Sequence, residues 1–326
     1  MVMRRRAQRG SRAWVPASLL LVAMLTSAVP GWAATTPKTR RVSVSSAGAE
    51  GNNWSYYPSI SADGRFVAFS SDASNLVAGD GNGTSDVFVR DRATGKTRRV
   101  SVSSAGAEGN NASYDPSISA DGRFVAFHSD ASNLVAGDGN GTSDVFVRDR
   151  ATGKTRRVSV SSAGAEGNGD SYASSISADG RFVAFHSNAS NLVAGDGNGT
   201  SDIFVHDRAT GKTRRVSVSS AGAQGNGASY NPSISADGRF VAFHSNASNL
   251  VAGDGNGTTD VFVHDRATGK TRRVSVSSAG AEGNGASYNP SISADGRFVA
   301  FESSASNLVA GDGNGTSDIF VRGPLR

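Results

Sequence analysis

The feature that most constrains this chain is a sequence unit that occurs five times in tandem. The run Thr39-Arg40-Arg41-Val42 recurs at Thr97, Thr155, Thr213 and Thr271, so the unit repeats every 58 residues. Each unit reads TRRVSVSSAGAEGN, then SYxPSISADGRFVAF, then SASNLVAGDGNGTSDVFVRDRATGK, with few changes. A repeat of this length predicts a solenoid, a propeller or another array of similar units.

Within one unit, four short segments have the residue pattern of β-strands: residues 58–61, 65–71, 86–90 and 97–103. Asp63-Gly64 predicts a tight hairpin between the first two, because glycine readily adopts a positive φ. No segment of the unit shows helical periodicity. Four short antiparallel strands per unit are typical of a propeller blade. We therefore predict an all-β fold, a five-bladed β-propeller with four-stranded antiparallel blades over residues 39–326.

The two ends of the repeat array predict how the propeller closes. The TRRVSVS segment at residues 39–46 precedes the first complete blade, and the last unit stops soon after the strand at residues 318–321. Pairing residues 39–46 with 318–321 would give the fifth blade its fourth strand. Closure would also leave only short, protected sheet edges. An open array is the alternative.

The repeat also resembles a known family. The run Tyr-x-Pro-Ser-Ile-Ser-Ala-Asp-Gly-Arg-Phe-Val-Ala-Phe, followed by Ser-Asp-Val-Phe-Val-Arg-Asp, is similar to the WD40-like (PD40) repeat of the TolB β-propeller family. The resemblance covers residues 39–322 and implies the propeller fold. It implies no activity, because one fold supports many functions.

The first segment has the pattern of an export signal. Arg4, Arg5, Arg6, Arg9 and Arg12 precede an apolar stretch, and small residues at Gly31 and Ala33 predict cleavage after Ala33. We therefore expect a signal peptide at residues 1–33, a short linker at 34–38, and a protein that is secreted or located in the periplasm or cell envelope. An uncleaved membrane anchor is the alternative.

The net charge of +5 comes from this leader alone, because the rest of the chain has 28 basic and 28 acidic residues. This balance argues against nucleic-acid binding through a broad cationic surface. We expect a monomer that has no stable membrane insertion after cleavage.

Long connections at residues 47–55 and 72–85 share one face of the predicted propeller, and we expect the ligand there because long loops often carry function. The best candidates are positions that differ between copies, since Trp54 and Tyr57 have unlike counterparts in the other units. A repeated tyrosine lies beside them. Aromatic, amide and acidic groups together suit recognition of a sugar or peptide. The predicted ligand-binding residues are Trp54, Tyr56, Tyr57, Tyr114, Asp115, Asp170, Tyr172, Tyr230, Asn231, Tyr288 and Asn289.

The loop Asp80-Gly81-Asn82-Gly83-Thr84-Ser85-Asp86 resembles the start of an EF-hand calcium loop, although Ser85 stands where the turn glycine belongs. The predicted calcium ligands are Asp80, Asn82, Asp86, Asp138, Asn140, Asp144, Asp196, Asn198, Asp202, Asp254, Asn256, Asp260, Asp312, Asn314 and Asp318. Asx turns that lead into the next strand are the alternative.

The sequence contains no cysteine, and neither HExxH nor GxSxG occurs. His128, His186 and His244 share one repeated position, but they lie on separate blades, so we expect hydrogen-bonded strand residues rather than a metal site. We predict a binding or interaction module for a carbohydrate, peptide or protein. The alternatives are a propeller glycoside hydrolase or lyase that uses Asp115 and Asp170, and a structural envelope protein.

Overall fold

The computed structural model describes residues 38–325. The predicted signal peptide and residues 34–37 of the predicted linker lie outside this range. All strands of the described residues fall in one compact unit, Arg41–Arg326. Between residues 38 and 325 there is no helix with the length and apolarity that a membrane span requires.

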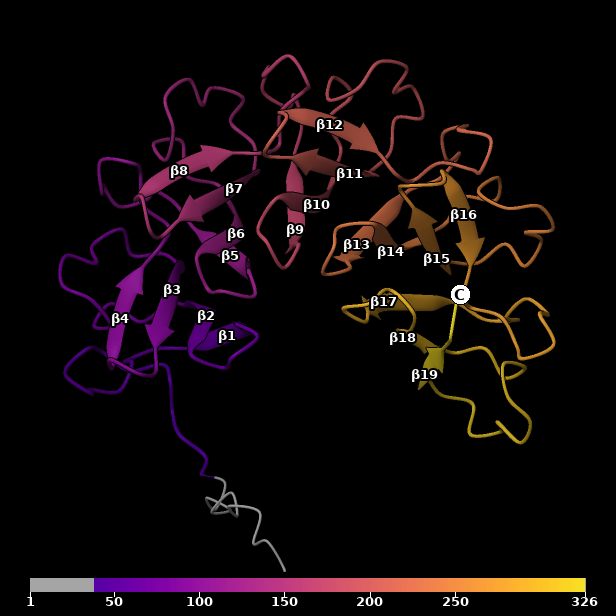
Figure 1. The fold of residues 1–326 in the computed structure, drawn as a ribbon, viewed down its shortest axis with the longest axis horizontal. Coiled ribbons are helices and arrows are strands. Elements are labelled where there is room, and N and C mark those ends of the chain that lie inside the picture. The colour runs from indigo at the N-terminus through magenta and orange to yellow at the C-terminus, as the bar shows by residue number, and fades with distance from the viewer. Residues whose placement is uncertain (1–37, 326) are drawn as a thin grey trace, which may run out of the picture. The chain divides into compact units, whose positions relative to one another are not determined.

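The chain forms five antiparallel sheets that follow one another in sequence order (Figure 1). We number these sheets as blades 1 to 5. Blade 1 contains β1 (Ser55–Ile60), β2 (Phe66–Ser71), β3 (Asp86–Asp91) and β4 (Lys96–Arg99). Blade 2 contains β5 (Ser113–Ile118), β6 (Phe124–Ser129), β7 (Asp144–Asp149) and β8 (Lys154–Arg157). Blade 3 contains β9 (Ser171–Ile176), β10 (Phe182–Ser187), β11 (Asp202–Asp207) and β12 (Lys212–Arg215). Blade 4 contains β13 (Ser229–Ile234), β14 (Phe240–Ser245), β15 (Asp260–Asp265) and β16 (Lys270–Arg273). Blade 5 has three strands, β17 (Ser287–Ile292), β18 (Val299–Ser303) and β19 (Asp318–Arg322).

The hairpin between β1 and β2 forms as its sequence predicts. Gly64 has φ of 68°, and the Asp63 carboxylate accepts hydrogen bonds from the Ser61 hydroxyl and the Arg65 amide. The Ser61 amide bonds to the Phe66 carbonyl at 2.9 Å and closes the turn. The short side chains and the glycine therefore make this turn from local contacts alone.

The hydrophobic core lies between neighbouring blades. One cluster joins Val87, Val89 and Ala68 of blade 1 to Val125 and Phe127 of blade 2, and the same arrangement recurs down the chain. Burial of each large side chain contributes about 1.5–3 kcal/mol. Blades that share a core in this way stabilise one another, as in other repeat architectures.

The loop between β2 and β3 is also anchored by an apolar side chain. Leu76 is buried, and so are its counterparts in the other four blades. Gly51 lies against Ala73 and Leu76, so the two long connections of one blade pack together.

The predicted outer strand is shorter than its sequence pattern indicates. Strand β4 ends at Arg99 rather than continuing to residue 103, because the Ser101 hydroxyl turns inward to bond Asp86 and the Val87 amide. The chain then forms a small hairpin through the bridge Val102↔Glu108. This hairpin bonds to blade 2, where the Thr155 hydroxyl donates to the Val102 carbonyl.

The predicted pairing of residues 39–46 with residues 318–321 is not seen. Strand β19 pairs with β18 only, within the described part of the chain. Residues 42–51 instead form the hairpin that the other repeats form at this place, and they bond to blade 1 through Thr97 and Arg90. The physical reason is that the outer strand ends early. The residues after it, from Ser43 onwards in the first repeat, therefore bond to the following blade and do not extend the strand.

Candidate functional site

One repeated position of the innermost strands has an unusual backbone. Tyr57, Asp115, Ala173, Asn231 and Asn289 have φ values of 52°, 50°, 47°, 50° and 50°. A β-bulge shifts the strand register next to this position in every blade. Asn and Asp tolerate a left-handed backbone, whereas Tyr and Ala do so with strain. Such strain is concentrated at functional sites, which marks this column as a candidate.

The column lines a single pocket of about 410 Å³, to which all five blades contribute. Its members present a phenol, a carboxylate, a methyl group and two amides to the same space. The Asn231 side-chain amide donates to the Asn289 side-chain oxygen at 2.9 Å. The five blades have nearly the same sequence, yet at this pocket they bring together side chains of different chemistry.

A second hollow, of about 660 Å³, opens beside the first two blades. It is lined by Trp54, Tyr56, Tyr57, Asp72, Tyr114, Asp115 and His128. The Trp54 side chain is 78% exposed. Tyr56 is held in place because its hydroxyl donates to Asp72 at 2.7 Å and lies 2.8 Å from the Ser85 hydroxyl. Burial raises the pKa of Tyr56 to about 12, so this phenol stays protonated.

Asp115 and His128 give this hollow its polar character. The Asp115 Oδ2 atom lies 3.7 Å from His128 Nδ1. Burial raises the pKa of Asp115 and lowers the pKa of His128 to about 4. His128 is therefore neutral at pH 7 and forms no ion pair. Asp115 Oδ1 and His128 Nδ1 are both buried without a hydrogen-bond partner in the described residues. Buried polar atoms are normally bonded, so a ligand with donor and acceptor groups would satisfy them.

The histidine column forms part of an aromatic ladder that crosses the blade boundaries. His128 lies between Tyr114 and Tyr172, with ring centroids 5.6 and 5.3 Å away. His186 lies between Tyr172 and Tyr230 at 5.7 and 5.3 Å. The expectation of hydrogen-bonded histidines was wrong at Nδ1 of His128 and His186, which have no partner in the described chain. Ring packing against tyrosine holds these side chains instead.

These histidines predict acid sensitivity. Burial lowers the pKa of His128, His186 and His244 to about 4, below the ordinary value near 6.5. The unfolded chain therefore binds more protons, and the free energy of unfolding falls as pH drops from 6.5 to 4. Blade 1 has Ser70 at this position, so we expect replacement of the three histidines by serine to reduce that fall by a few kcal/mol, at about 1.4 kcal/mol per pKa unit.

Urea unfolding of both proteins at pH 7.5, 6, 5 and 4 measures this difference. The comparison cancels the effect of Asp80, Asp138 and Asp254, whose raised pKa of about 6 acts in the opposite direction. Parallel pH profiles for the two proteins would contradict the prediction.

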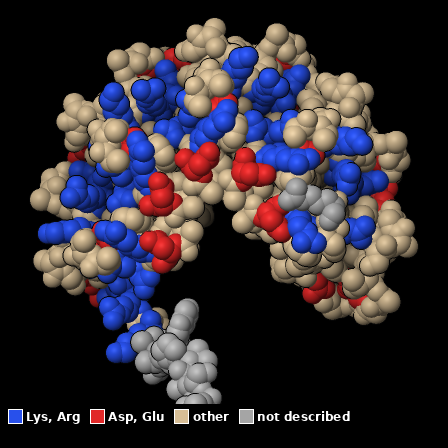
Figure 2. Space-filling view, viewed as in Figure 1, with Lys and Arg blue, Asp and Glu red and all other residues tan. Residues whose placement is uncertain are grey.

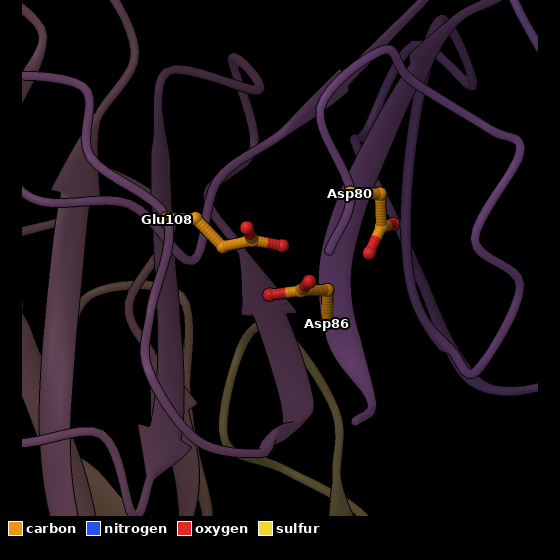
Figure 3. A group of neighbouring side chains, drawn as sticks. All are labelled: Asp80, Asp86 and Glu108. Carbon is orange, nitrogen blue, oxygen red and sulfur yellow. The ribbon is translucent and has the colours of Figure 1, made fainter. Parts of the chain in front are cut away.

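A cluster of three carboxylates lies on the long-loop side of three of the four boundaries between neighbouring blades, and at the boundary of blades 3 and 4 Gln224 stands in place of the glutamate. In the first, Asp80 and Asp86 of blade 1 meet Glu108 from the following hairpin (Figure 3). The Arg99 guanidinium lies among them, 2.9 Å from Asp86, 3.4 Å from Asp80 and hydrogen-bonded to Glu108. Arg99 belongs to the outer strand β4, but its side chain is only 9% exposed. Asp86 and Glu108 are too far apart in the sequence for the pattern to have revealed their contact.

The structure brings the predicted calcium residues Asp80 and Asp86 together, but it does not direct Asn82 towards them as an oxygen ligand. The Asn82 side-chain oxygen accepts from the Thr84 amide, and its nitrogen donates to Asp86. The same two contacts recur at Asn140, Asn198, Asn256 and Asn314. These are the contacts of an Asx turn. Calcium at this loop stays a prediction, and it would require Arg99 to move away.

Comparison with solved structures shows the nature of the repeated sheets. The chain aligns with TolB from Acinetobacter baumannii at 19% identity and a TM-score of 0.47, covering 78% of this chain and 53% of that one. It aligns with a putative TolB from Agrobacterium tumefaciens at 17% identity and a TM-score of 0.49, covering 83% and 82%. The propeller domain of the Trilobed protease from Pyrococcus furiosus, described as having an open velcro topology, aligns at 12% identity and a TM-score of 0.50, covering 84% and 70%.

The repeated sheets of this chain are similar to the blades of a β-propeller. The chain spans about half the length of the Acinetobacter baumannii protein. No protein-family model matches the sequence, and no curated protein matches it either. At these identities the likeness concerns the fold alone.

The predicted ligand residues fall into three groups in this fold. Trp54, Tyr56, Tyr57, Tyr114 and Asp115 line the hollow, and Tyr57 and Asp115 also border the central pocket with Asn231 and Asn289. Tyr172, Tyr230 and Tyr288 belong to the ladder. Asp170 lines neither space, and its carboxylate accepts from the Ser143 amide at 3.0 Å.

Sequence reasoning missed Asp72 and His128 as lining residues of the hollow. No local motif marks them, since both recur or nearly recur in other blades. Two further histidines, His206 and His264, are buried and bond to Thr213 and Thr271 at 2.9 Å.

Proposed function

We propose that this protein is a secreted or envelope-associated binding module whose ligand site is the hollow formed by Trp54, Tyr56, Tyr57, Tyr114 and Asp115. Carbohydrate is the ligand class that the site supports best. The observation that carries the proposal is an exposed indole beside tyrosine rings and a carboxylate with an unpartnered buried oxygen. Aromatic faces pack against the C–H surfaces of a sugar, and polar groups bond to its hydroxyls.

The position of the hollow supports a recognition role. Trp54 lies just before β1 and Tyr57 lies on it, so both belong to the innermost strand of blade 1 and the long connection before it. Trp54 has Ala112, Ala228 and Ala286 as counterparts in three other blades. Only one blade therefore offers the indole, and one sugar residue on this side is the expected occupant.

The structure gives less support to the alternative of a glycoside hydrolase or lyase. Asp115 lies in the hollow, but Asp170 bonds to the backbone of Ser143 and lines neither the hollow nor the central pocket. A pair of carboxyl groups that flank one glycosidic bond is therefore not assembled from these two residues. A glycan screen that also monitors product release separates binding from turnover.

We expect Trp54→Ala to weaken binding of the glycan identified in that screen by about tenfold or more, because a desolvated tryptophan is typical of binding hot spots. Asp115→Asn should weaken it as well by removing the carboxylate. Val309→Ala is the matched control, since it also truncates an exposed apolar side chain but lies in blade 5. Isothermal titration measures the three affinities. Equal affinities for all variants would contradict the site.

We further propose that the five blades close into a ring, in which blade 5 contacts blade 1. Several apolar side chains of blades 1 and 5 are exposed, although the equivalent side chains of other blades are buried. Ile60 is 59% exposed, whereas Ile118, Ile176 and Ile234 are 8% exposed against the preceding blade. At the other end, Ile319 and Val321 of β19 are 74% and 68% exposed. Each end thus carries one half of an apolar interface that is complete at the four other boundaries.

The charged clusters support the same closure. Asp312 and Asp318 have no arginine bonded to them in the described residues, unlike their counterparts. Arg41 and Glu50 pair with each other at the start of the chain, and they occupy the repeat positions of Arg99 and Glu108. Joining the two ends would complete a fourth cluster of three carboxylates and one arginine.

A crosslinking experiment tests closure in this cysteine-free chain. The Ala62 amide bonds to the Ala120 carbonyl at 3.0 Å, and the link continues from Ala120 to Ala178, to Ala236 and to Ala294. In a closed ring Ala294 would lie beside Ala62. We expect the double variant Ala62→Cys, Ala294→Cys to form a disulfide or a short-linker crosslink within one molecule.

The pair Ala178→Cys, Ala236→Cys is the positive control, because these turns are already in contact. Non-reducing electrophoresis and mass spectrometry distinguish a crosslinked monomer from a dimer. Crosslinked dimers, or no crosslink while the control pair reacts fully, would refute closure within one chain.

A further inference from the structure

The charges of each blade are segregated between its two ends. At the end with the short connections, blade 2 carries the basic residues Arg123, Arg150, Lys154 and Arg156, against the acids Asp121 and Asp149. The long-loop end carries Asp130, Asp138, Asp144 and Glu166, against Arg157. The neutral repeat region therefore has one basic face, which repeats from blade to blade. Figure 2 shows Lys and Arg gathered over the outer strands β4, β8, β12 and β16.

Two grooves are formed on this basic face. The blade 2–3 groove, of about 680 Å³, runs along Lys154, Arg156, Ser161 and Ser162 and ends at Arg208 of blade 3. The blade 3–4 groove, of about 710 Å³, has the equivalent lining, with Lys212 and Arg214 on its wall. Each groove thus places cationic side chains beside several hydroxyl groups.

The basic residues of the blade 2–3 groove are only partly compensated. Arg123 holds Asp149 through two hydrogen bonds of 2.9 and 2.8 Å. Arg208 stacks on the Phe124 ring at 4.2 Å and bonds to the Gly180 carbonyl. The side chains of Lys154 and Arg156 are exposed and have no hydrogen bond or ion pair among the described residues. Burial lowers the pKa of Arg208, and the neighbouring Arg156 and Arg123 act in the same direction.

At the boundary of blades 4 and 5, a segment of the chain itself lies against the arginine that is equivalent to Arg156. The residues Arg322, Pro324 and Leu325 line the groove there. Arg272, the counterpart of Arg156, donates to the Leu325 carbonyl oxygen at 3.0 Å. Arg98, Arg156 and Arg214 have no such acceptor within residues 38–325. An oxygen-bearing chain that lies across the basic face therefore fits the same position in the other grooves.

We propose that the basic face binds an acidic polysaccharide, whose sulfate or carboxylate groups bond to Arg98, Arg156 and Arg214 while its hydroxyls bond to the groove serines. The repeated spacing of the grooves suits a polymer that carries an anion on many of its units. This surface lies at the opposite end of the blades from the Trp54 hollow and acts independently of it.

Binding of dextran sulfate to the mature protein at increasing salt concentration tests the proposal, with uncharged dextran of matched length as the control polymer. We expect dextran sulfate to bind more tightly than dextran, and the affinity for dextran sulfate alone to fall with salt. The triple variant Arg98→Ser, Arg156→Ser, Arg214→Ser should lose about tenfold or more in affinity and show a weaker salt dependence, since fewer anions are neutralised.

Single variants give a matched comparison. Arg156→Ser and Arg214→Ser should each weaken binding more than Arg272→Ser, although all three remove one positive charge from the same column, because Arg272 is already bonded to Leu325. Val309→Ala, which lies outside both the basic grooves and the proposed ligand hollow, should leave dextran sulfate binding unchanged. Unchanged affinity of the triple variant would overturn the proposal. Tighter binding of single-stranded DNA or of phosphatidylserine vesicles than of the polysaccharide would overturn it as well.

Discussion

Replacement of Gly180 by alanine is expected to destabilise the protein by about 3–4 kcal/mol, the sum of a strained backbone and a steric clash. Gly180 has φ of 72°, where alanine costs about 1–2 kcal/mol. A Cβ atom there would overlap the ring of Phe124 from the preceding blade. The neighbouring blades would have to separate locally, which opens their shared core. Urea unfolding followed by tryptophan fluorescence and circular dichroism measures the loss.

Gly211→Ala is the matched control for this prediction. Gly211 has a similar φ of 70°, but no atom lies within 4 Å of a Cβ there. Only the backbone cost of about 1–2 kcal/mol is then expected. Equal losses for the two variants would contradict the prediction. In the closed ring Gly64→Ala should cost as much as Gly180→Ala, because Phe298 would take the place that Phe124 has at Gly180.

Removal of Arg157 is expected to be as severe, at about 3–5 kcal/mol, because it leaves buried carboxylates without a counter-charge. Arg157 lies 2.9 Å from Asp144 and 3.3 Å from Asp138, and it also bonds to Glu166. Asp144 is fully buried. In Arg157→Ala the carboxyl groups of Asp138, Asp144 and Glu166 therefore lie together with no positive charge between them. Equilibrium unfolding at pH 7 and pH 5 measures the loss.

The pH dependence of this variant follows from Asp138, whose pKa is raised to about 6 by burial. A carboxyl group with a raised pKa takes up a proton in the folded state before it does so in the unfolded state. Its repulsion therefore disappears as pH falls below 6. The loss caused by Arg157→Ala should be smaller at pH 5 than at pH 7.

Blade 3 provides the control for the arginine. There Gln224 replaces the glutamate and donates to both Asp196 and Asp202 at 2.8 Å. Arg215→Ala should therefore cost less than Arg157→Ala. The change Glu166→Gln should be tolerated, since it recreates the cluster of blade 3. An equal loss for the two arginine variants would contradict this account.

Much of the fold was predictable from the sequence, because the signals were local. The Asp-Gly turns and the alternating Phe and Val residues specify four short segments in each unit, and the 58-residue period places them in blades. The predicted hairpin at Gly64 is found. The outer strand was overestimated, since Ser101 interrupts a pattern that still alternates.

The candidate site was predictable only in part. Trp54 and Tyr57 were recognised because they differ from their repeat counterparts, and both lie at the hollow. Asp170 was selected by the same rule, but it bonds to the neighbouring blade's backbone. A difference between repeats identifies a position that is free to vary. Whether that position faces a cavity depends on the packing of the next blade.

By itself the sequence determined the blade, because turn chemistry and strand alternation act between residues close together in the chain. Only the tertiary structure decided which polar groups lose water without gaining a partner, such as Asp115 and His128, and which cation stands among Asp80, Asp86 and Glu108. Those outcomes depend on desolvation and on charges brought together across blade boundaries. Such effects arise only when units distant in the sequence are packed side by side.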